Sequence, residues 1–205
     1  MIKHIVFDVD RTLVDSFEPE LLSLQEAIEI VTKQKLERED LSKLTTLPTS
    51  EFFKRLNLSD LEIKQINKEW EITFSKYKTV CFKNIKELIK ELNNRGYIID
   101  IITSRTLEEY HELDNELSDI SNIINTVITS DIIKNPKPNS ESMDLLCSRA
   151  NCSKDEIVYV GDSKIDKDFS ISSGCLFIPA CWENKDLMNE ENACFDPIDI
   201  LKRLW

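Results

Sequence analysis

Short apolar runs alternate with stretches of helical periodicity at the beginning of the chain and again from residue 79 onward. The first run is Ile5-Val6-Phe7, and four more follow at residues 97–102, 126–129, 157–160 and 175–178. Runs of this length, rich in branched and aromatic residues, are typical of strands buried on both faces. Between them, apolar residues recur at helical spacing, as they do from Ile85 to Leu92. Strands that alternate with helices predict an α/β fold, with a parallel sheet and helices on both of its faces.

Residues 17–77 have a different pattern, which is helical and contains no convincing strand. Ser59 and Glu62 form a capping box that would open one helix of this block. An earlier helix would carry one apolar stripe: Leu21, Leu24, Ala27, Ile28 and Val31. The block interrupts the first connection between a strand and a helix. We therefore predict an α/β core of residues 1–15 and 79–205, with an all-α subdomain, residues 16–78, inserted after the first strand and overhanging the strand ends.

Glycine is rare in this chain, which contains only three. An average protein contains roughly 7% glycine, so we expect these three where the backbone geometry requires them. Gly96 follows the helical stretch that ends at Leu92 and is expected to cap it. Gly161 lies between an apolar run and Asp162, and Gly174 precedes the last apolar run. Two of the three glycines therefore bracket one short region.

The composition argues against several classes of function. The net charge is −12 and the isoelectric point is near 4.7, which argues against nucleic acid as a partner because phosphate backbones need a basic surface. No stretch approaches the length of a transmembrane span, so we expect no membrane partner. The six cysteines contain no CxxC pair, which favours reduced thiols in a cytoplasmic protein over disulfides or a zinc site. We expect a monomer or a weak dimer.

The most informative segment is FDVDRTLVDS, residues 7–16, at the end of the first predicted strand. Asp8 and Asp10 fall just beyond this strand, where open α/β sheets bind their ligands. Two carboxylates this close repel each other unless a cation lies between them or one of them is protonated. The pair therefore indicates a reactive site rather than a packing role.

Three later segments also place polar residues at or after the ends of predicted strands. Thr103 follows the second apolar run, and Lys137 lies in the proline-flanked stretch NPKPNSE. Asp162 and Asp166 occur in GDSKID, directly after the fourth run. The last pair also fits an ordinary helix N-terminus, in which Ser163 is the cap and Asp166 faces the helix dipole.

In this order, the four segments resemble the motifs of the haloacid dehalogenase-like (HAD) hydrolases, most of which are magnesium-dependent phosphatases. The first resembles DxDxTLxDS and the last resembles GDSxxD. The lysine motif of the family is often KPxP, and Ser140 takes the place of its second proline here. Lys134 is a rival for the lysine, but no proline follows it, and Lys137 is preferred. The helical insert is similar to the family's α-helical cap, as in the phosphoglycolate phosphatase-like group, and the resemblance implies a Rossmann-like core.

The resemblance implies a role for each residue in the hydrolysis of a small phosphorylated metabolite. Asp8 would be the nucleophile, forming an aspartyl-phosphate, and Asp10 would be the general acid and base. Lys137 would offset negative charge, and Thr103 would orient the phosphoryl group. The cofactor would be Mg²⁺, which offsets the repulsion between a carboxylate and a phosphate dianion. Its ligands would be Asp8, the backbone carbonyl of Asp10, Asp162, and Asp166, the last acting directly, through water or through Lys137. The substrate-binding candidates are Thr103, Ser104, Arg105 and Arg11.

Arg11 is the main departure from the family pattern, whose commonest residue at this position is Gly. If the backbone there needs a positive φ, an arginine would be strained, and a weakened site would leave a phosphate-binding regulatory protein without turnover. Alternatively, Arg11, with Arg105, would contact a second anionic group of the substrate. Asp10 favours phosphoryl transfer, because the dehalogenases of the family replace it. A phosphomutase would need the same four motifs and is the alternative enzyme.

Overall fold

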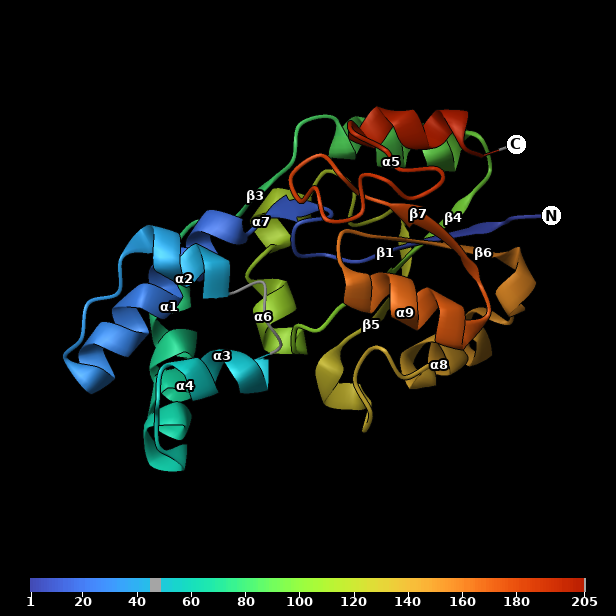
Figure 1. Cartoon of the computed structure of the whole chain (residues 1–205). Coiled ribbons are helices and arrows are strands. Elements are labelled where there is room, and N and C mark those ends of the chain that lie inside the picture. Colours follow the sequence, from blue (N-terminus) through green and yellow to red (C-terminus); the bar gives the residue numbers. More distant parts are fainter. Residues whose placement is uncertain (45–48, 205) are drawn as a thin grey trace. The chain divides into compact units, whose positions relative to one another are not determined.

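The computed structural model describes residues 1–44 and 49–204, and the side chains of residues 42–51 are left aside. The chain forms two compact units, one made of Met1–Asp15 together with Val80–Trp205, the other of Ser16–Thr79 (Figure 1). The first unit is discontinuous in sequence, because the second is inserted between its first and later strands. The first unit contains every residue that the sequence assigned to the site.

The first unit is built on a five-stranded sheet with the strand order β5-β4-β1-β6-β7. The strands are β1 (His4–Phe7), β4 (Ile98–Ile102), β5 (Ile124–Ile128), β6 (Ile157–Gly161) and β7 (Leu176–Pro179). All four pairings are parallel. Phe7 stands opposite Ile101 on one side and Val160 on the other, so these three strands end at the same edge of the sheet. The predicted α/β fold with a parallel sheet is confirmed.

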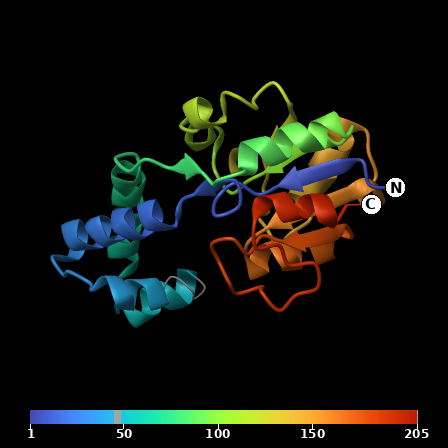
Figure 2. The ribbon, with the colours of Figure 1, turned by 90° about the horizontal axis from the view of Figure 1, so that it is seen from above.

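Helices cover both faces of this sheet. They are α5 (Ile85–Asn94), α6 (Leu107–His111), α7 (Asp114–Leu117), α8 (Glu141–Ala150) and α9 (Lys164–Ser173), with the 3₁₀ segments η1 (Ser130–Ile132), η2 (Lys154–Glu156) and η3 (Pro197–Lys202). In Figure 1, α5 lies on one side of the strands and α8 and α9 lie on the other. Figure 2, seen from above, shows η3 beside α5.

Two hydrophobic clusters, one on each face, hold these helices to the strands. Ile5 of β1 packs in one cluster with Leu88 of α5, whereas Val6 packs in the other with Met143 of α8 and Phe169 of α9. Successive strand residues point to opposite faces, so a strand covered on both sides must be apolar at every position. Burial of each such side chain contributes about 1.5–3 kcal/mol, which explains why the predicted strands are continuous apolar runs.

Two polar side chains are nevertheless buried within the sheet. His4 opens β1 and Asp100 lies in the middle of β4, and His4 Nδ1 is 2.6 Å from Asp100 Oδ2. Asn125 donates to the other carboxylate oxygen at 2.9 Å. These partners replace the water that a buried carboxylate would otherwise need. The contacts of Asp100 with His4 and Asn125 therefore connect the adjacent strands β1, β4 and β5, away from the edge at which the site lies.

A small second sheet lies where the chain leaves and re-enters the first unit. Its strands, β2 (Val14–Asp15) and β3 (Val80–Cys81), are antiparallel. The sequence did not predict them, because two residues are too few to establish an alternating pattern.

Within its described residues, 16–44 and 49–79, the second unit contains four helices, α1 (Phe17–Thr32), α2 (Arg38–Leu44), α3 (Thr49–Arg55) and α4 (Asp60–Phe74). Its hydrophobic cluster includes Leu21 of α1, Phe53 of α3 and Ile66 of α4. The predicted capping box is confirmed at the start of α4, where Ser59 and Glu62 each accept from the other's backbone N–H. Among the described helices of the whole chain, none combines the length and the apolar character that crossing a membrane requires.

Candidate active site

The ends of three neighbouring strands carry the central residues of the site. Asp8 follows β1, Thr103 follows β4, and Asp162 follows β6. The backbone N–H of Asp8 continues the sheet by donating to Val160 O at 2.9 Å. Because these strands are parallel and adjacent, side chains just beyond their ends are brought to one edge, as expected of an open α/β sheet.

Lys137 joins the carboxylates at this edge. Its Nζ lies 2.6 Å from Asp8 Oδ1 and 2.8 Å from Asp166 Oδ1, and it donates to the Tyr159 hydroxyl at 2.9 Å. The Tyr159 hydroxyl in turn lies 3.1 Å from Asp166 Oδ1. The Lys137 side chain is only 7% exposed, so its charge is balanced by protein groups rather than by water. The structure therefore brings together the predicted nucleophile, the predicted lysine and the second aspartate of the last motif.

Asp8, Asp162 and Asp166 are all buried, and each offers a carboxylate oxygen within 4.8 Å of the others. The Lys137 ammonium contacts two of these three carboxylates, those of Asp8 and Asp166. Burial, together with repulsion by Asp166 and Asp162, raises the pKa of Asp8 well above its ordinary value despite the Lys137 ammonium. Burial alone would lower the pKa of Lys137, but the two carboxylates that it contacts outweigh burial and raise it.

The two carboxylates bound to Lys137 respond in opposite directions because their other partners differ. Burial would raise the pKa of Asp166, but Lys137 and the hydroxyl and N–H of Ser163 outweigh burial, and the pKa is lowered. For Asp8, the Lys137 ammonium does not outweigh burial, so the charged form of this carboxyl is disfavoured. A divalent cation fits this donor set, because Mg²⁺ prefers carboxylate oxygens and three of them lie close enough together to share one ion.

Gly161 permits the close approach of Asp166. A Cβ atom added to Gly161 would lie 2.5 Å from Asp166 Cβ and 2.6 Å from its Cγ. Asp166 also closes the capping box of α9, because it accepts from the N–H of Ser163 while its own N–H donates to Ser163 Oγ. The ordinary reading of this pair as a helix N-terminus is thus correct, and the same carboxylate also binds Lys137.

Two residues at the site were not identified from the sequence. Tyr159 was read only as a strand residue, and strand periodicity does not reveal what its hydroxyl contacts. Asn184 lies in the loop after β7, and its side-chain amide donates to Asp162 Oδ2 at 3.1 Å and to the Asp162 carbonyl at 3.2 Å. No motif surrounds Asn184, so no signal in a single sequence could have indicated this contact.

Asp10 lies beside the buried cluster, in the loop after β1, and pairs with Arg105. Arg105 donates from Nε to Asp10 Oδ2 at 2.9 Å and from an Nη atom to Oδ1 at 2.6 Å. Thr103 is buried, and its hydroxyl oxygen accepts the backbone N–H of Arg105 at 3.1 Å. Ser104, between them, is exposed. Of the three candidates that follow β4, Thr103 and Arg105 are therefore buried and Ser104 is exposed.

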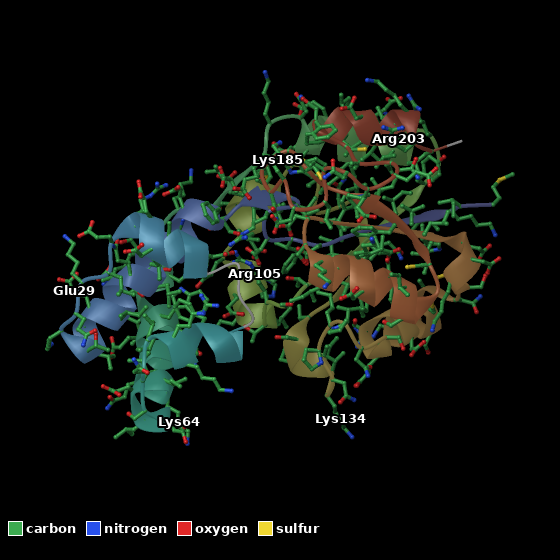
Figure 3. All side chains as sticks on the ribbon, in the orientation of Figure 1. Glu29, Lys64, Arg105, Lys134, Lys185 and Arg203 are labelled. Carbon is green, nitrogen blue, oxygen red and sulfur yellow. The ribbon has the colours of Figure 1, made fainter. Side chains whose placement is uncertain are left out.

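Arg11 has a φ of 58°, in the left-handed region that non-glycine residues rarely occupy. The backbone at residue 11 therefore has the positive φ that would strain an arginine. Lys134, the rival of Lys137, is exposed and lies at the outer end of the loop before α8 (Figure 3). It is Lys137 and not Lys134 that reaches the carboxylates.

The model of the haloacid dehalogenase-like hydrolase family matches residues 5–180. The chain belongs to this family. The match begins in β1 and extends through β7, so it includes every site residue except Asn184. The predicted family and the predicted class of enzyme, a hydrolase, are confirmed.

Known relatives cover almost the whole chain. Pyrophosphatase PpaX of Bacillus velezensis is 27% identical over 202 residues, which cover 98% of this chain and 92% of that protein. A solved structure described as a predicted phosphoglycolate phosphatase from Haemophilus somnus has a TM-score of 0.80 at 22% identity, covering 98% of this chain and 97% of the other. CbbY from Rhodobacter sphaeroides, solved with xylulose-(1,5)bisphosphate, has a TM-score of 0.75 at 19% identity and covers 97% and 96%. The two solved structures establish a shared fold.

Proposed function

We propose that this protein is a magnesium-dependent phosphatase that hydrolyses a small phosphate monoester through an aspartyl-phosphate. The observation that carries the proposal is the buried Asp8 carboxylate, held at 2.6 Å by Lys137 beside Asp162 and Asp166. A carboxylate fixed by an ammonium group at the end of a strand is suited to nucleophilic attack, because its geometry is set before substrate binds. The names of the relatives, a pyrophosphatase and a phosphoglycolate phosphatase, are consistent with this class of reaction.

In the first step, an oxygen of Asp8 forms a bond to phosphorus while the bond from phosphorus to the leaving oxygen breaks. Asp10 gives its proton to that oxygen. In the second step, water attacks the phosphorus, Asp10 takes a proton from the water, and the bond to Asp8 breaks to release phosphate. The Thr103 hydroxyl would orient the phosphoryl group; in support, its oxygen accepts the N–H of Arg105, which leaves its O–H able to turn to another acceptor.

Charge explains the need for a metal ion. Asp8, Asp162, Asp166 and the backbone carbonyl of Asp10 would hold Mg²⁺, which would offset the negative charge of the phosphoryl oxygens when bound. Lys137 remains between Asp8 and Asp166 and opposes the charge that develops during attack. Repulsion from Asp166 and Asp162 already helps to raise the pKa of Asp8, and an incoming phosphate dianion would add further negative charge beside these carboxylates.

Hydrolysis is favoured over the regulatory alternative because the polar groups that the chemistry requires are all present at one edge of the sheet. The substrate we propose is a small phosphorylated metabolite, with Ser104 and Arg11 as further candidates to contact it. A cytoplasmic location is proposed because all six cysteines are free thiols, as is usual in reducing compartments.

The test is phosphate release by the purified chain from a panel of sugar phosphates, nucleotides, pyrophosphate and phosphoglycolate, with Mg²⁺ and with EDTA. We expect release from at least one compound, its loss in EDTA, and its loss in Asp8→Asn. Asp155→Asn, which changes an exposed aspartate outside the site, is the matched control and should keep full activity. Mg²⁺ should also raise the melting temperature of the wild type, because a ligand that binds only the folded state stabilises it. Activity that survives Asp8→Asn, or no release from any compound, would overturn the proposal.

A further inference from the structure

Arg105 makes more contacts at the site than a substrate-binding role explains. Its side chain, only 6% exposed, forms a two-point ion pair with Asp10, with nitrogen–oxygen distances of 2.6 and 2.9 Å. The other Nη atom donates to the carbonyl of Glu109, in α6, at 3.2 Å. The planar guanidinium thus connects the loop after β1 to the first helix after β4. Such a fork fixes both the position and the plane of a carboxylate, which an ammonium group cannot do.

The backbone of Arg105 is fixed as well. Its N–H donates to the Thr103 hydroxyl oxygen at 3.1 Å, and its carbonyl accepts the N–H of Ser130, after β5, at 2.8 Å. A residue held at both its backbone groups and its side chain has little freedom to move. Arg105 (labelled in Figure 3) is therefore a rigid connection between two neighbouring strand ends and the Asp10 carboxylate.

Asp10 needs such a support. It follows the buried nucleophile by two residues, its side chain is 29% exposed, and the next residue has a positive φ. A carboxylate on a partly exposed loop samples several rotamers unless it is held, and a displacement of about 1 Å in a catalytic group can cost on the order of 10²-fold in rate.

We propose that Arg105 is a positioning residue, which holds the carboxylate of Asp10 in place to give a proton to the leaving oxygen and to take one from the attacking water. The proposal rests on the proposed function, in which Asp10 is the general acid and base. It departs from the reading of Arg105 as a substrate ligand. Arg105 would then orient two side chains of the site. Its backbone N–H would orient Thr103 at the phosphoryl group, and its side chain would orient Asp10 at the leaving oxygen.

The test uses the basicity of the leaving group. An alkoxide is a strong base and must receive a proton as it leaves, whereas p-nitrophenolate is a weak base and leaves without one. The rate of leaving-group release in a single turnover with Mg²⁺ reports the first step alone. It is measured for glycerol phosphate and p-nitrophenyl phosphate with the wild type, Arg105→Gln, Asp10→Asn and the double variant.

We expect Arg105→Gln to slow release from glycerol phosphate by roughly 10²-fold, within the range of general acid catalysis, and release from p-nitrophenyl phosphate by about 3-fold or less. The double variant should be no slower than Asp10→Asn, because two residues that act as a unit have non-additive effects. Arg105→Lys should recover part of the rate for glycerol phosphate, since it restores the charge but not the fork. Arg95→Gln, which breaks an exposed ion pair on α5, is the matched control and should change neither rate.

Three results would overturn the proposal. A rise in the KM of both substrates with kcat unchanged would mean that Arg105 binds substrate. An equal loss of rate on both substrates, with a lowered melting temperature, would mean that Arg105 only supports the fold. Additive losses in the double variant would mean that Arg105 does not act through Asp10. Failure of the proposed function is a separate outcome, since it would appear as full release of both leaving groups by Asp8→Asn.

Discussion

The contact between Gly161 and Asp166 allows a single methyl group to test how the site is held together. In Gly161→Ala, the new Cβ would lie 2.5 Å from Asp166 Cβ, 2.6 Å from Cγ and 2.8 Å from Oδ2. Ordinary contact begins at 3.4 Å, so the two residues must separate by about 1 Å. Since one of the crowded atoms is a Cβ, a change of rotamer cannot relieve the overlap, and the start of α9 must shift.

A shift of Asp166 would break its contact with Lys137. Moving Asp166 by about 1 Å would stretch the 2.8 Å distance between Asp166 Oδ1 and Lys137 Nζ beyond hydrogen-bond range. Overpacking of this kind costs about 1–3 kcal/mol, and each kcal/mol lowers the melting temperature of a chain of this size by about 2–4 °C. Lys137 would then be held by Asp8 and Tyr159 alone, and we expect kcat/KM to fall on the order of 10²-fold because the lysine is misplaced.

Gly174, at the other end of α9, provides the matched control. Its φ is +73°, and no atom lies within 4 Å of the position that a Cβ would take. Gly174→Ala should therefore lose about 1–2 kcal/mol from backbone strain alone, without displacing Asp166. Melting temperature and kcat/KM are compared for both variants at a temperature at which each is folded. Equal activity of the two variants would refute the argument that the missing side chain at Gly161 sets the position of Asp166.

Three further predictions concern the metal, the backbone and the surface. Asn184→Ala should raise the Mg²⁺ concentration for half-maximal activity by roughly 10-fold, because partners that orient a metal ligand contribute to affinity; an unchanged Mg²⁺ requirement would contradict this role of its contact with Asp162. Arg11→Gly should raise the melting temperature by about 2–4 °C through relief of strain at φ 58°, and a lowered melting temperature would count against strain. If Arg11 contacts the substrate, the same variant should change the ranking of mono- and dianionic phosphates by kcat/KM, and an unchanged ranking would count against that contact. Hydrogen bonds from Lys3 and Ser153, together with the charge of Lys3, lower the pKa of Glu156 from 4.5 to about 2. The stability of the wild type over Glu156→Gln, from urea unfolding, should therefore be fully present above pH 4.5 and lost as the pH falls through about 2; a pH-independent difference would exclude these contacts of the ionised carboxylate as its source.

The parallel sheet could be predicted because its strands are short, mainly apolar runs that alternate with helical stretches. The His4–Asp100 pair could not, because it depends on which residues become neighbours across β1 and β4. The same limit applies to the two-residue strands β2 and β3, whose pairing is set by the entry and exit of the insert.

The candidate site was predictable where one short segment supplied the chemistry. Asp8 and Asp166 could be selected because each lies in a compact motif directly after a strand, and Lys137 because a proline follows it. The sequence could not show that Arg105 binds Asp10 or that Asn184 binds Asp162, because each pair is joined only by the tertiary fold. A side chain that orients another side chain has no characteristic sequence spacing to its partner, so a single sequence does not reveal it.

The central place of β1 in the sheet affects the order in which the chain can fold during synthesis. β1 pairs with β4 and β6, which end at residues 102 and 161, beyond the whole helical insert. At about 5–20 residues per second, β6 leaves the ribosome roughly 8–30 s after β1. The insert is a continuous stretch with its own hydrophobic cluster, so its synthesis is complete during this interval, whereas the apolar segment of β1 still lacks one of its two neighbours. That strand is therefore an apolar segment of the nascent chain that needs protection from aggregation.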